Sequence, residues 1–159
     1  MKIGIAGFGT IGKKVAQALD QGIDGLELCG VYTRSADDAR RGLAGFRHPV
    51  QVQTMGELTA TADVVVECVP KAAFMDVAPA VIAAGKLLVT VSGAALLEHP
   101  ELIAAARRRG ARIILATGAL LGLDAVRAAA EGVIHSASIV TRKPPRSLAD
   151  AEVVKQRGL

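Results

Sequence analysis

Short apolar runs alternate along the chain with longer segments in which apolar residues recur at helical spacing. The runs predict seven strands, at 2–6, 26–32, 50–52, 64–68, 87–91, 112–116 and 134–142. The segments between them predict five helices, at 11–20, 36–43, 71–84, 100–109 and 124–131. In the first helix Ile11, Val15 and Leu19 follow the spacing i, i+4, i+8, so they form one stripe that can face a sheet. Strands separated by helices predict βαβ units, and hence an α/β fold with a doubly wound parallel sheet covered by helices on both faces.

Proline and glycine residues mark the ends of several predicted helices. Pro100 stands at a helix start, where the first turn tolerates proline. Gly110 and Gly132 each follow a helix, and glycine in the left-handed conformation often ends helices in this way. Pro79 interrupts the segment 71–84, so we expect a kink or a break there.

The last apolar run differs from the others. Its sequence "VIHSASIVTR" alternates apolar and polar residues, so one face is less deeply buried than in the earlier strands. We expect it to open a second sheet rather than to close the first. A strand with an open edge promotes pairing between chains, so we also expect self-association through residues 134–141, or else mobility of this segment.

Composition supports a buried parallel sheet and argues against nucleic acid as a partner. Hydrophobic residues make up 51% of the 159 residues and aromatic residues 3%, with no Trp, so the core must be packed from Ala, Val, Leu and Ile. The net charge is +4. The cations are scattered in short clusters without neighbouring aromatic residues, which is typical of solvated helix ends. These clusters are 13–14, 40–41, 107–109 and 142–143.

Cysteine usage and hydropathy limit the location of the protein. Cys29 and Cys68 are too few for a disulfide framework, and no spacing of Cys and His indicates a metal site. The longest uncharged runs, 87–97 and 113–123, are shorter than the ~18–20 residues that a membrane span needs. We therefore expect a protein of the reducing cytoplasm, without metal and without a membrane partner.

The sequence "GFGTIG" at 7–12 is a GxGxxG motif between an apolar strand and an amphipathic helix, which is the context that a dinucleotide-binding motif requires. Gly7 permits a tight turn, Gly9 leaves room for the pyrophosphate, and Gly12 lets the helix pack closely on the strand. The N–H groups of the helix start, at Thr10 and Ile11, can meet the phosphates. The alternative is a glycine-rich turn without a ligand.

The end of the second strand indicates which nicotinamide cofactor is favoured. NAD enzymes usually place Asp or Glu at this point, for the ribose hydroxyls. This chain has Thr33 and Arg34 instead, so no negative charge repels a 2′-phosphate and the guanidinium can pair with one. We therefore predict NADP, or the use of both NADP and NAD. The alternative is that Arg34 is an ordinary surface residue.

Ligands of doubly wound sheets bind at the carboxyl ends of the strands. Small residues follow three of these strand ends, and they allow a flat ring to approach the main chain. We expect the nicotinamide to contact Val69, Pro70, Ser92, Ala94 and Ala119. Turn formation alone is the alternative for Ser92.

Hydride-transfer enzymes usually need an acid or a base near the reacting carbon. None of the three histidines, His48, His99 and His135, is placed convincingly by the sequence. Asp124 is better explained as an acidic residue that favours the start of its helix. Lys71 is better explained as a solvent-exposed residue at the start of another helix. The sequence therefore assigns no catalytic residue.

Two segments together resemble the L-aspartate dehydrogenase family. "TGALLGLDAV" at 117–126 is similar to a Ser-Gly-Ala-Ile-Gly-Gly-Leu-Asp-Ala motif, and "ASIVTRKPP" at 137–145 is similar to a strand end with Thr-Arg-Lys-Pro-Pro. "LLVTVSGAALLEHPEL" at 87–102 resembles the fifth-strand segment of the family. The resemblance covers nearly all of the chain.

The resemblance implies a Rossmann domain over 1–132 and the first strand and tail of a catalytic domain over 133–159. It implies reversible oxidation of L-aspartate to iminoaspartate with NAD or NADP, linked to NAD biosynthesis, and in reverse the reductive amination of oxaloacetate with ammonia. A homo-oligomer is expected. By motif match, the glycine-loop residues bind the cofactor and Ala119 lies near the nicotinamide. Arg142 and Lys143 match the basic strand end.

Two departures from the family pattern keep alternatives open. Thr117 and Leu120–Leu121 replace the usual Ser and Ile-Gly, and no Asn occurs in the chain, whereas the family has a later Asn-x-His segment. A non-catalytic NAD(P)-binding module, or a degenerate paralogue, is therefore the second hypothesis. Another Rossmann oxidoreductase is the third. The sugar oxidoreductases carry Glu-Lys-Pro where this chain has Val91–Gly93, and dihydrodipicolinate reductases carry paired histidines, so both are disfavoured.

Overall fold

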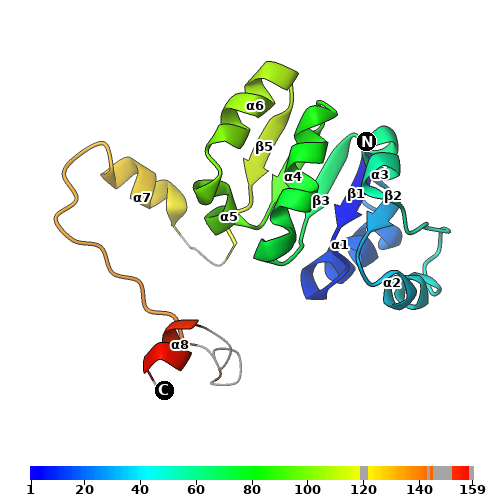
Figure 1. Ribbon diagram of the computed structural model, residues 1–159, viewed down its shortest axis with the longest axis horizontal. Helices are drawn as coiled ribbons and strands as arrows, with labels where there is room; N and C mark the ends of the chain where they lie inside the picture. Colours follow the sequence, from blue (N-terminus) through cyan, green and yellow to red (C-terminus); the bar gives the residue numbers. More distant parts are fainter. Residues whose placement is uncertain (119–121, 143, 145–151, 158–159) are drawn as a thin grey trace. The chain divides into compact units, whose positions relative to one another are not determined.

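The computed structural model describes residues 1–118, 122–142, 144 and 152–157, and its sheet confirms the predicted α/β fold. Five parallel strands lie in the order β2-β1-β3-β4-β5 (Figure 1). They are β1 (Lys2–Ala6), β2 (Glu27–Tyr32), β3 (Val64–Glu67), β4 (Leu87–Thr90) and β5 (Arg112–Leu115). Parallel strands joined by helices place helices on both faces of the sheet, as expected.

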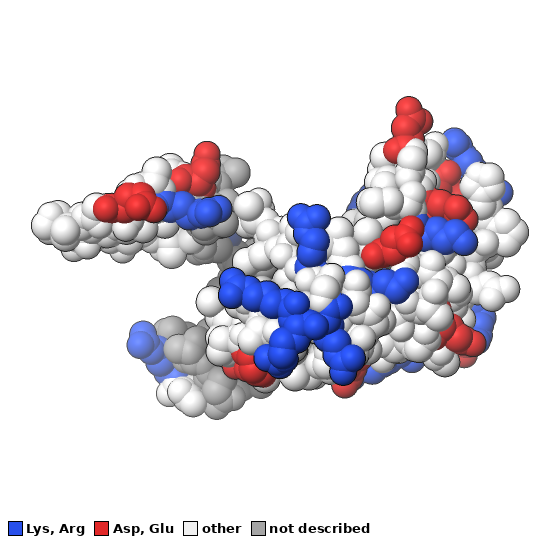
Figure 2. Space-filling view, turned by 90° about the horizontal axis from the view of Figure 1, so that it is seen from above, with Lys and Arg blue, Asp and Glu red and all other residues white. Residues whose placement is uncertain are grey.

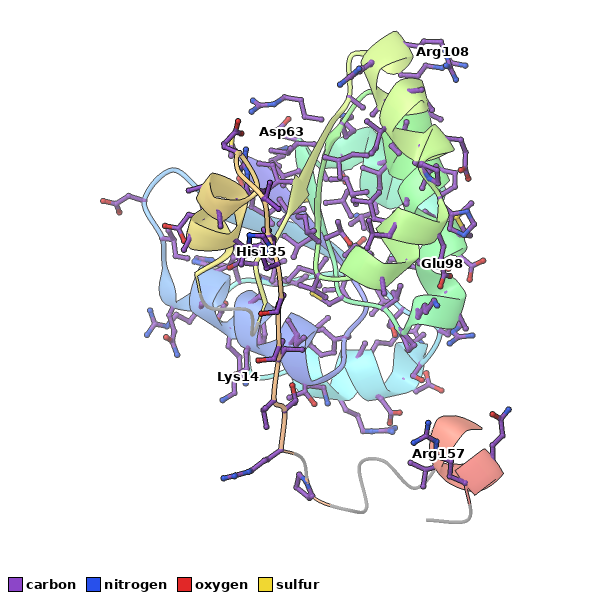
Figure 3. All side chains as sticks on the ribbon, turned by 90° about the vertical axis from the view of Figure 1, so that its left-hand side faces the viewer. Lys14, Asp63, Glu98, Arg108, His135 and Arg157 are labelled. Atoms are coloured by element: carbon purple, nitrogen blue, oxygen red, sulfur yellow. The ribbon has the colours of Figure 1, made fainter. Side chains whose placement is uncertain are left out.

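Two apolar clusters form the core, one on each face of the sheet. The first face is covered by α1 (Thr10–Gln21) and α2 (Ala36–Leu43). The second is covered by α3 (Met55–Thr61), α4 (Phe74–Ala83), α5 (Gly93–Glu98) and α6 (Glu101–Arg109), with the short 3-10 helix η1 (Lys71–Ala73) before α4. Labelled charged side chains such as Lys14, Asp63 and Arg108 lie at the periphery (Figure 3). The core is packed mainly from Ala, Val, Leu and Ile, as the composition predicts, but Phe74 and Phe8 are buried in it as well.

The strand order reverses between β1 and β3, and this reversal determines where a ligand can bind. Ala6 pairs with Tyr32 on one side and with Glu67 on the other, and Glu67 in turn pairs with Thr90. Thr90 pairs with Leu115. The carboxyl ends of all five strands are therefore level, and they form a single edge at which a doubly wound sheet takes its ligands.

The predicted strand at 50–52 is wrong. Only an isolated bridge joins Val52 to Val31 there. Hydrogen bonds run from Val31 N to Gln51 O at 3.0 Å and from Gln53 N to Val31 O at 2.8 Å. Thr54 then caps α3. The pairing beside β2 therefore ends at Gln53, because the next residue already caps α3.

Pro79 does not break α4, which runs continuously from Phe74 to Ala83, so of the expected kink or break the break is wrong and the kink stays a prediction. Buried side chains such as Val77 and Val81 hold this helix against the sheet. Pro100 is the N-cap of α6, and Gly110 ends it with φ 67°, as the sequence predicts. Gly132 is not among the glycines with positive φ, so its predicted left-handed conformation is wrong.

The chain divides into two compact units, residues 1–119 and 120–159. The second contains α7 (Leu123–Ala129) and α8 (Glu152–Arg157). Residues 133–142 form no strand, so the strand predicted at 134–142, which was to open a second sheet, is wrong. The physical reason is that no other strand lies among the described residues of this unit to pair with it. The predicted domain boundary after residue 132 stays a prediction.

Cations are exposed at the opposite end of the sheet from the carboxyl edge. Arg107, Arg108 and Arg109 form the last turn of α6, and Lys and Arg side chains gather on the face shown in Figure 2. Cations at a helix C-terminus interact favourably with the helix dipole. No described helix is long and apolar enough to cross a membrane.

Candidate functional site

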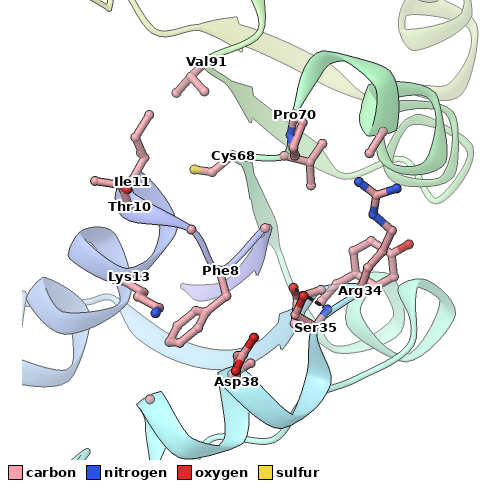
Figure 4. Close-up of a pocket in the computed structure, with 18 of the residues that line it drawn as sticks. Phe8, Thr10, Ile11, Lys13, Arg34, Ser35, Asp38, Cys68, Pro70 and Val91 are labelled. Carbon is pink, nitrogen blue, oxygen red and sulfur yellow. Dashed lines mark hydrogen bonds between the residues drawn. The ribbon is translucent and has the colours of Figure 1, made fainter. Parts of the chain in front are cut away.

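A cavity of about 870 Å³ opens at the carboxyl edge of the sheet, where the strand order reverses. Its walls come from the turn between β1 and α1, the end of β2, helix α2, and the turns after β3 and β4 (Figure 4). Eight of the predicted cofactor-binding residues line it: Gly7, Gly9, Thr10, Ile11, Thr33, Arg34, Val69 and Pro70. The structure therefore brings together residues that are up to 63 positions apart, Gly7 and Pro70 being the most distant.

Each glycine of the turn is suited to its position for a different structural reason. Gly7 has φ 98°, and a Cβ there would lie 2.6 Å from Cys68 O. A Cβ on Gly12 would lie 1.9 Å from Gly7 O, so α1 can pack this closely only with glycine at this position. A Cβ on Gly9 would meet no protein atom within 4 Å. Gly9 therefore leaves open space on the side of the cavity, which is the space that a pyrophosphate would use.

The start of α1 favours an anion. Gly9 is its N-cap, no side chain caps the helix, and no acidic residue lies in the first turn. The first N–H groups of a helix have no partner within the helix, and they carry its positive dipole end. Lys13 also lines the cavity, and its Nζ lies 5.7 Å from the centre of the Phe8 ring. This end of the cavity can hold a phosphate group.

Arg34 and Ser35, at the end of β2, lie across the cavity from Thr10 and Ile11 (Figure 4). Ser35 N donates to Thr33 Oγ1 at 3.3 Å, which orders this turn. Arg34 is exposed and forms no ion pair with any described carboxylate. Its guanidinium is therefore available to a ligand.

Arg41 and Asp38 also line the cavity, on α2, but they form an ion pair with each other. This pair leaves Arg34 as the main uncompensated positive charge beside the end of β2. Sequence reasoning missed Arg41, Asp38 and Phe8 as lining residues. Only the position of Phe8, inside the glycine motif, could have indicated it.

The wall on the β3 side is apolar. Val69, Pro70 and Val91 line it together with Cys68. Burial raises the pKa of the Cys68 thiol to about 11, and the neighbouring carboxylate of Glu67 adds to this effect. The thiol is therefore protonated and unreactive at neutral pH.

Four predicted residues do not line the cavity. Gly12 lies behind the turn, in contact with Gly7. Ser92 precedes α5 and donates from its Oγ to Glu67 Oε1 at 3.0 Å, and Ala94 is exposed on α5. Ala119 lies outside the described residues.

Glu67 is the residue of this region that the sequence did not single out. It ends β3, is fully buried, and accepts hydrogen bonds from both strand-end turns. The available signal was a lone carboxylate at the end of an otherwise apolar strand. A charged side chain is almost never fully buried unless it has partners.

No described histidine lines the cavity. His99 stacks on Phe74 with ring centres 6.5 Å apart, and its Nδ1 lies 3.0 Å from Glu101 Oε1. His48 and His135 are exposed. Among the described residues, no group of His, Cys, Asp and Glu could hold a metal ion.

The sequence matches a known family of cofactor-binding domains. The profile described as "Homoserine dehydrogenase, NAD binding domain" matches residues 7–116. Among solved structures, a homoserine dehydrogenase from Thiobacillus denitrificans superposes with a TM-score of 0.60 at 21% identity, over 72% of this chain and 29% of that chain. A UDP-N-acetylglucosamine 3-dehydrogenase from Acidithiobacillus ferrooxidans gives 0.61 at 26% identity, over 71% and 37%. The fold is therefore that of Rossmann dehydrogenases.

Curated relatives extend the match over the whole chain. L-aspartate dehydrogenase from Bradyrhizobium diazoefficiens is 44% identical over 97% of this chain and 55% of its own length. L-aspartate dehydrogenase 3 from Bordetella bronchiseptica is 40% identical over 99% of this chain and 58% of its own length. The chain thus spans somewhat more than half the length of the curated relatives that it matches.

Proposed function

Because the chain belongs to the family of NAD-binding domains of the homoserine dehydrogenase type, and its curated relatives are L-aspartate dehydrogenases, we propose that it is the cofactor-binding part of an L-aspartate dehydrogenase. The reaction is the oxidation of L-aspartate to iminoaspartate, or in reverse the reductive amination of oxaloacetate with ammonia. The nicotinamide cofactor accepts or donates the hydride. The observation that carries the cofactor-binding role is the open space at Gly9, beside an uncapped helix start, in a cavity at the strand reversal. The choice of aspartate as the substrate rests on the relatives.

The residues of the cavity fit a dinucleotide. The glycine turn and the N–H groups at Thr10 and Ile11 would hold the pyrophosphate. Val69 and Pro70 offer an apolar wall on the other side of the reversal, where the nicotinamide half would lie. Ser92, Ala94 and Ala119 stay predicted contacts of the nicotinamide.

We propose a preference for NADP over NAD. Two features support it: the neutral Thr33 at the end of β2, and the guanidinium of Arg34 without a described ion-pair partner. A 2′-phosphate carries nearly two negative charges that such a guanidinium can bind bidentately. Dual use of both cofactors is the weaker form of the same proposal.

A second candidate function is a non-catalytic NAD(P)-binding module. The observation that favours it is that no described histidine lines the cavity. Its lining residues include one carboxylate, Asp38, and that group is paired with Arg41. A general acid or base therefore does not stand out among the described residues.

Two measurements test these functions. The first is binding of NADPH and NADH to the purified chain, and the second is aspartate-dependent reduction of NADP⁺ and NAD⁺ at alkaline pH, followed by the absorbance of the reduced nicotinamide. Binding without turnover supports the cofactor-binding part or the module, and turnover shows that the chain itself transfers the proton. Failure to bind either dinucleotide would overturn the proposal.

The cellular setting belongs to the same proposal. Cys29 and Cys68 are both free, which supports a reducing, cytoplasmic location. The substrates are small molecules, and we propose that the protein acts as a homo-oligomer without a nucleic-acid or membrane partner.

A further inference from the structure

The buried carboxylate of Glu67 is surrounded by hydrogen-bond donors, an arrangement that the packing of the apolar core does not require. Its side chain is fully buried at the carboxyl end of β3, and it does not line the cavity. Three donors converge on its carboxylate. Val69 N donates to Oε1 at 2.8 Å, Ser92 Oγ donates to the same oxygen at 3.0 Å, and Thr90 Oγ1 donates to Oε2. A buried carboxylate is costly unless such donors surround it, so its presence needs a reason.

The three donors come from the ends of two adjacent strands. Val69 lies in the turn after β3 and forms part of the cavity wall. Thr90 ends β4, and its Oγ1 also accepts from Ser92 N at 3.0 Å, at the start of α5. The carboxylate thus joins the turn after β3 to the turn after β4.

An ion pair on the protein surface also connects the segments that follow these two turns. Lys71 in η1 forms an ion pair with Glu98 of α5, and both side chains are exposed. An exposed pair of this kind contributes little by itself. The buried network is therefore the stronger constraint on the relative position of the two turns.

The location of this network relates it to one half of the dinucleotide. The strand order reverses between β1 and β3, and a dinucleotide lies across that reversal. The end of β2, with Arg34, faces one half of the ligand, so the ends of β3 and β4 face the other. On this basis, and resting on the proposed function, we propose that Glu67 is a positioning residue. It holds the turns after β3 and β4 in the shape that receives the nicotinamide half of the cofactor.

The test compares two ligands that differ only by the nicotinamide ring. These are NADPH and 2′-phospho-ADP-ribose, or NADH and ADP-ribose if the chain binds NADH more tightly. Their dissociation constants are measured by calorimetry for the wild type and the variants Glu67→Ala and Glu67→Gln. Val65→Ala is the matched control, because Val65 lies on the same strand, is fully buried and has no polar partner to lose.

We expect Glu67→Ala to weaken NADPH binding about tenfold or more, the effect of losing hydrogen bonds to a charged group, and to change fragment binding less than about twofold. Glu67→Gln keeps an oxygen for Val69 N and an amide group that can face Thr90 Oγ1, so it should recover most of the affinity. Val65→Ala should lower the midpoint of thermal unfolding and leave the ratio of the two affinities unchanged. Amide exchange of Val69 should become faster in Glu67→Ala and stay slow in Val65→Ala.

Several outcomes would overturn the inference. In Glu67→Ala, these are an equal loss of affinity for both ligands, or no loss of affinity for either. In Val65→Ala, it is the same selective loss of affinity for the dinucleotide. In the wild type, it is equal affinity for both ligands. If Glu67→Ala does not fold, Thr90→Val decides, because it removes one donor of the network and should give the same selective loss. A wild type that binds neither ligand would instead overturn the proposed function.

Discussion

At the scale of single residues, the sequence predicted the structure of the glycine motif well. The sequence indicated a separate purpose for Gly7, Gly9 and Gly12, and the structure places each in the matching environment. A tight turn, an open space and a close helix contact are local properties of a strand–turn–helix, so six consecutive residues are enough to predict them. Glu67 could not be found in this way, because its partners lie up to 25 residues away.

Gly9 and Gly12 should separate ligand binding from stability. For Gly9→Ala we expect little change in the free energy of unfolding, less than about 1 kcal/mol at an N-cap, since the new Cβ meets no protein atom within 4 Å. NADPH affinity should fall about tenfold or more, because the methyl group occupies the space of the pyrophosphate. Urea unfolding and calorimetry measure the two effects. Unchanged affinity would contradict the placement of the pyrophosphate.

Gly12→Ala should have the opposite profile. Its Cβ would lie 1.9 Å from Gly7 O and 3.3 Å from Ile5 Cγ2, so α1 must move away from β1. We expect a loss of about 1–3 kcal/mol in the free energy of unfolding, as for other overpacked sites. Urea unfolding without ligand measures it, and Gly9→Ala is the control. Wild-type stability of Gly12→Ala would show that the helix start is free to shift.

Arg34 should discriminate between the two cofactors. Arg34→Ala removes the guanidinium beside the end of β2, so NADPH binding should weaken about 10–100-fold, the range for one charge-assisted contact. NADH binding should change little. Arg40→Ala is the matched control, because Arg40 is exposed on α2, pairs with Asp37 and does not line the cavity. Equal losses of NADPH and NADH affinity would contradict a role in recognising the 2′-phosphate.

At the scale of elements, the long periodic segments and the apolar strands were predicted, whereas some of the short helices were not. Both α1 and α6 have several apolar positions at helical spacing, and the strands β1, β3 and β4 are apolar runs with clear ends. The helices α3 and α5, with seven and six residues, were missed, whereas α7, which also has seven residues, was predicted at 124–131. Local capping specifies α3: Thr54 accepts from Glu57 N, and Glu57 accepts from Thr54 N.

This capping box should make the stability of α3 depend on pH. The hydrogen bond from Thr54 N lowers the pKa of the Glu57 carboxyl, and the Thr54 hydroxyl lowers it further. A carboxyl with a lowered pKa stabilises the folded state above its unfolded pKa, of about 4.3, and this contribution is lost as the pH falls through the folded pKa. Glu57→Gln should therefore be less stable than the wild type at neutral pH, and the difference should shrink in acid. Thermal unfolding at several pH values measures this, and a difference that stays constant would contradict it.

At the scale of the whole molecule, the position of the cavity follows from the order of the strands in the sheet. The sequence predicted the class of sheet but not this order. The chain order of strands and helices indicates a doubly wound sheet, and the reversal between β1 and β3 then selects the cavity. The contacts expected at Ser92 and Ala94 depend on how the turn after β4 is oriented. That orientation follows from the Glu67 network and from α5, which no local pattern predicted.

Self-association is the last expectation at this scale, and it no longer depends on a strand. Val133, Ile139 and Val140 are 80%, 75% and 83% exposed, an unusual set of apolar side chains for one short segment. Burying each between two chains would contribute about 1.5–3 kcal/mol. We therefore expect the purified chain to self-associate, and the double variant Ile139→Lys, Val140→Lys to weaken the association about 100-fold or more. Analytical ultracentrifugation over a range of concentrations measures both. Leu97→Lys is the control, since Leu97 is equally exposed on α5, and it should leave the association unchanged. A wild type that stays monomeric at every concentration would show that these side chains remain in water, and it would remove the support for a homo-oligomer formed through this segment.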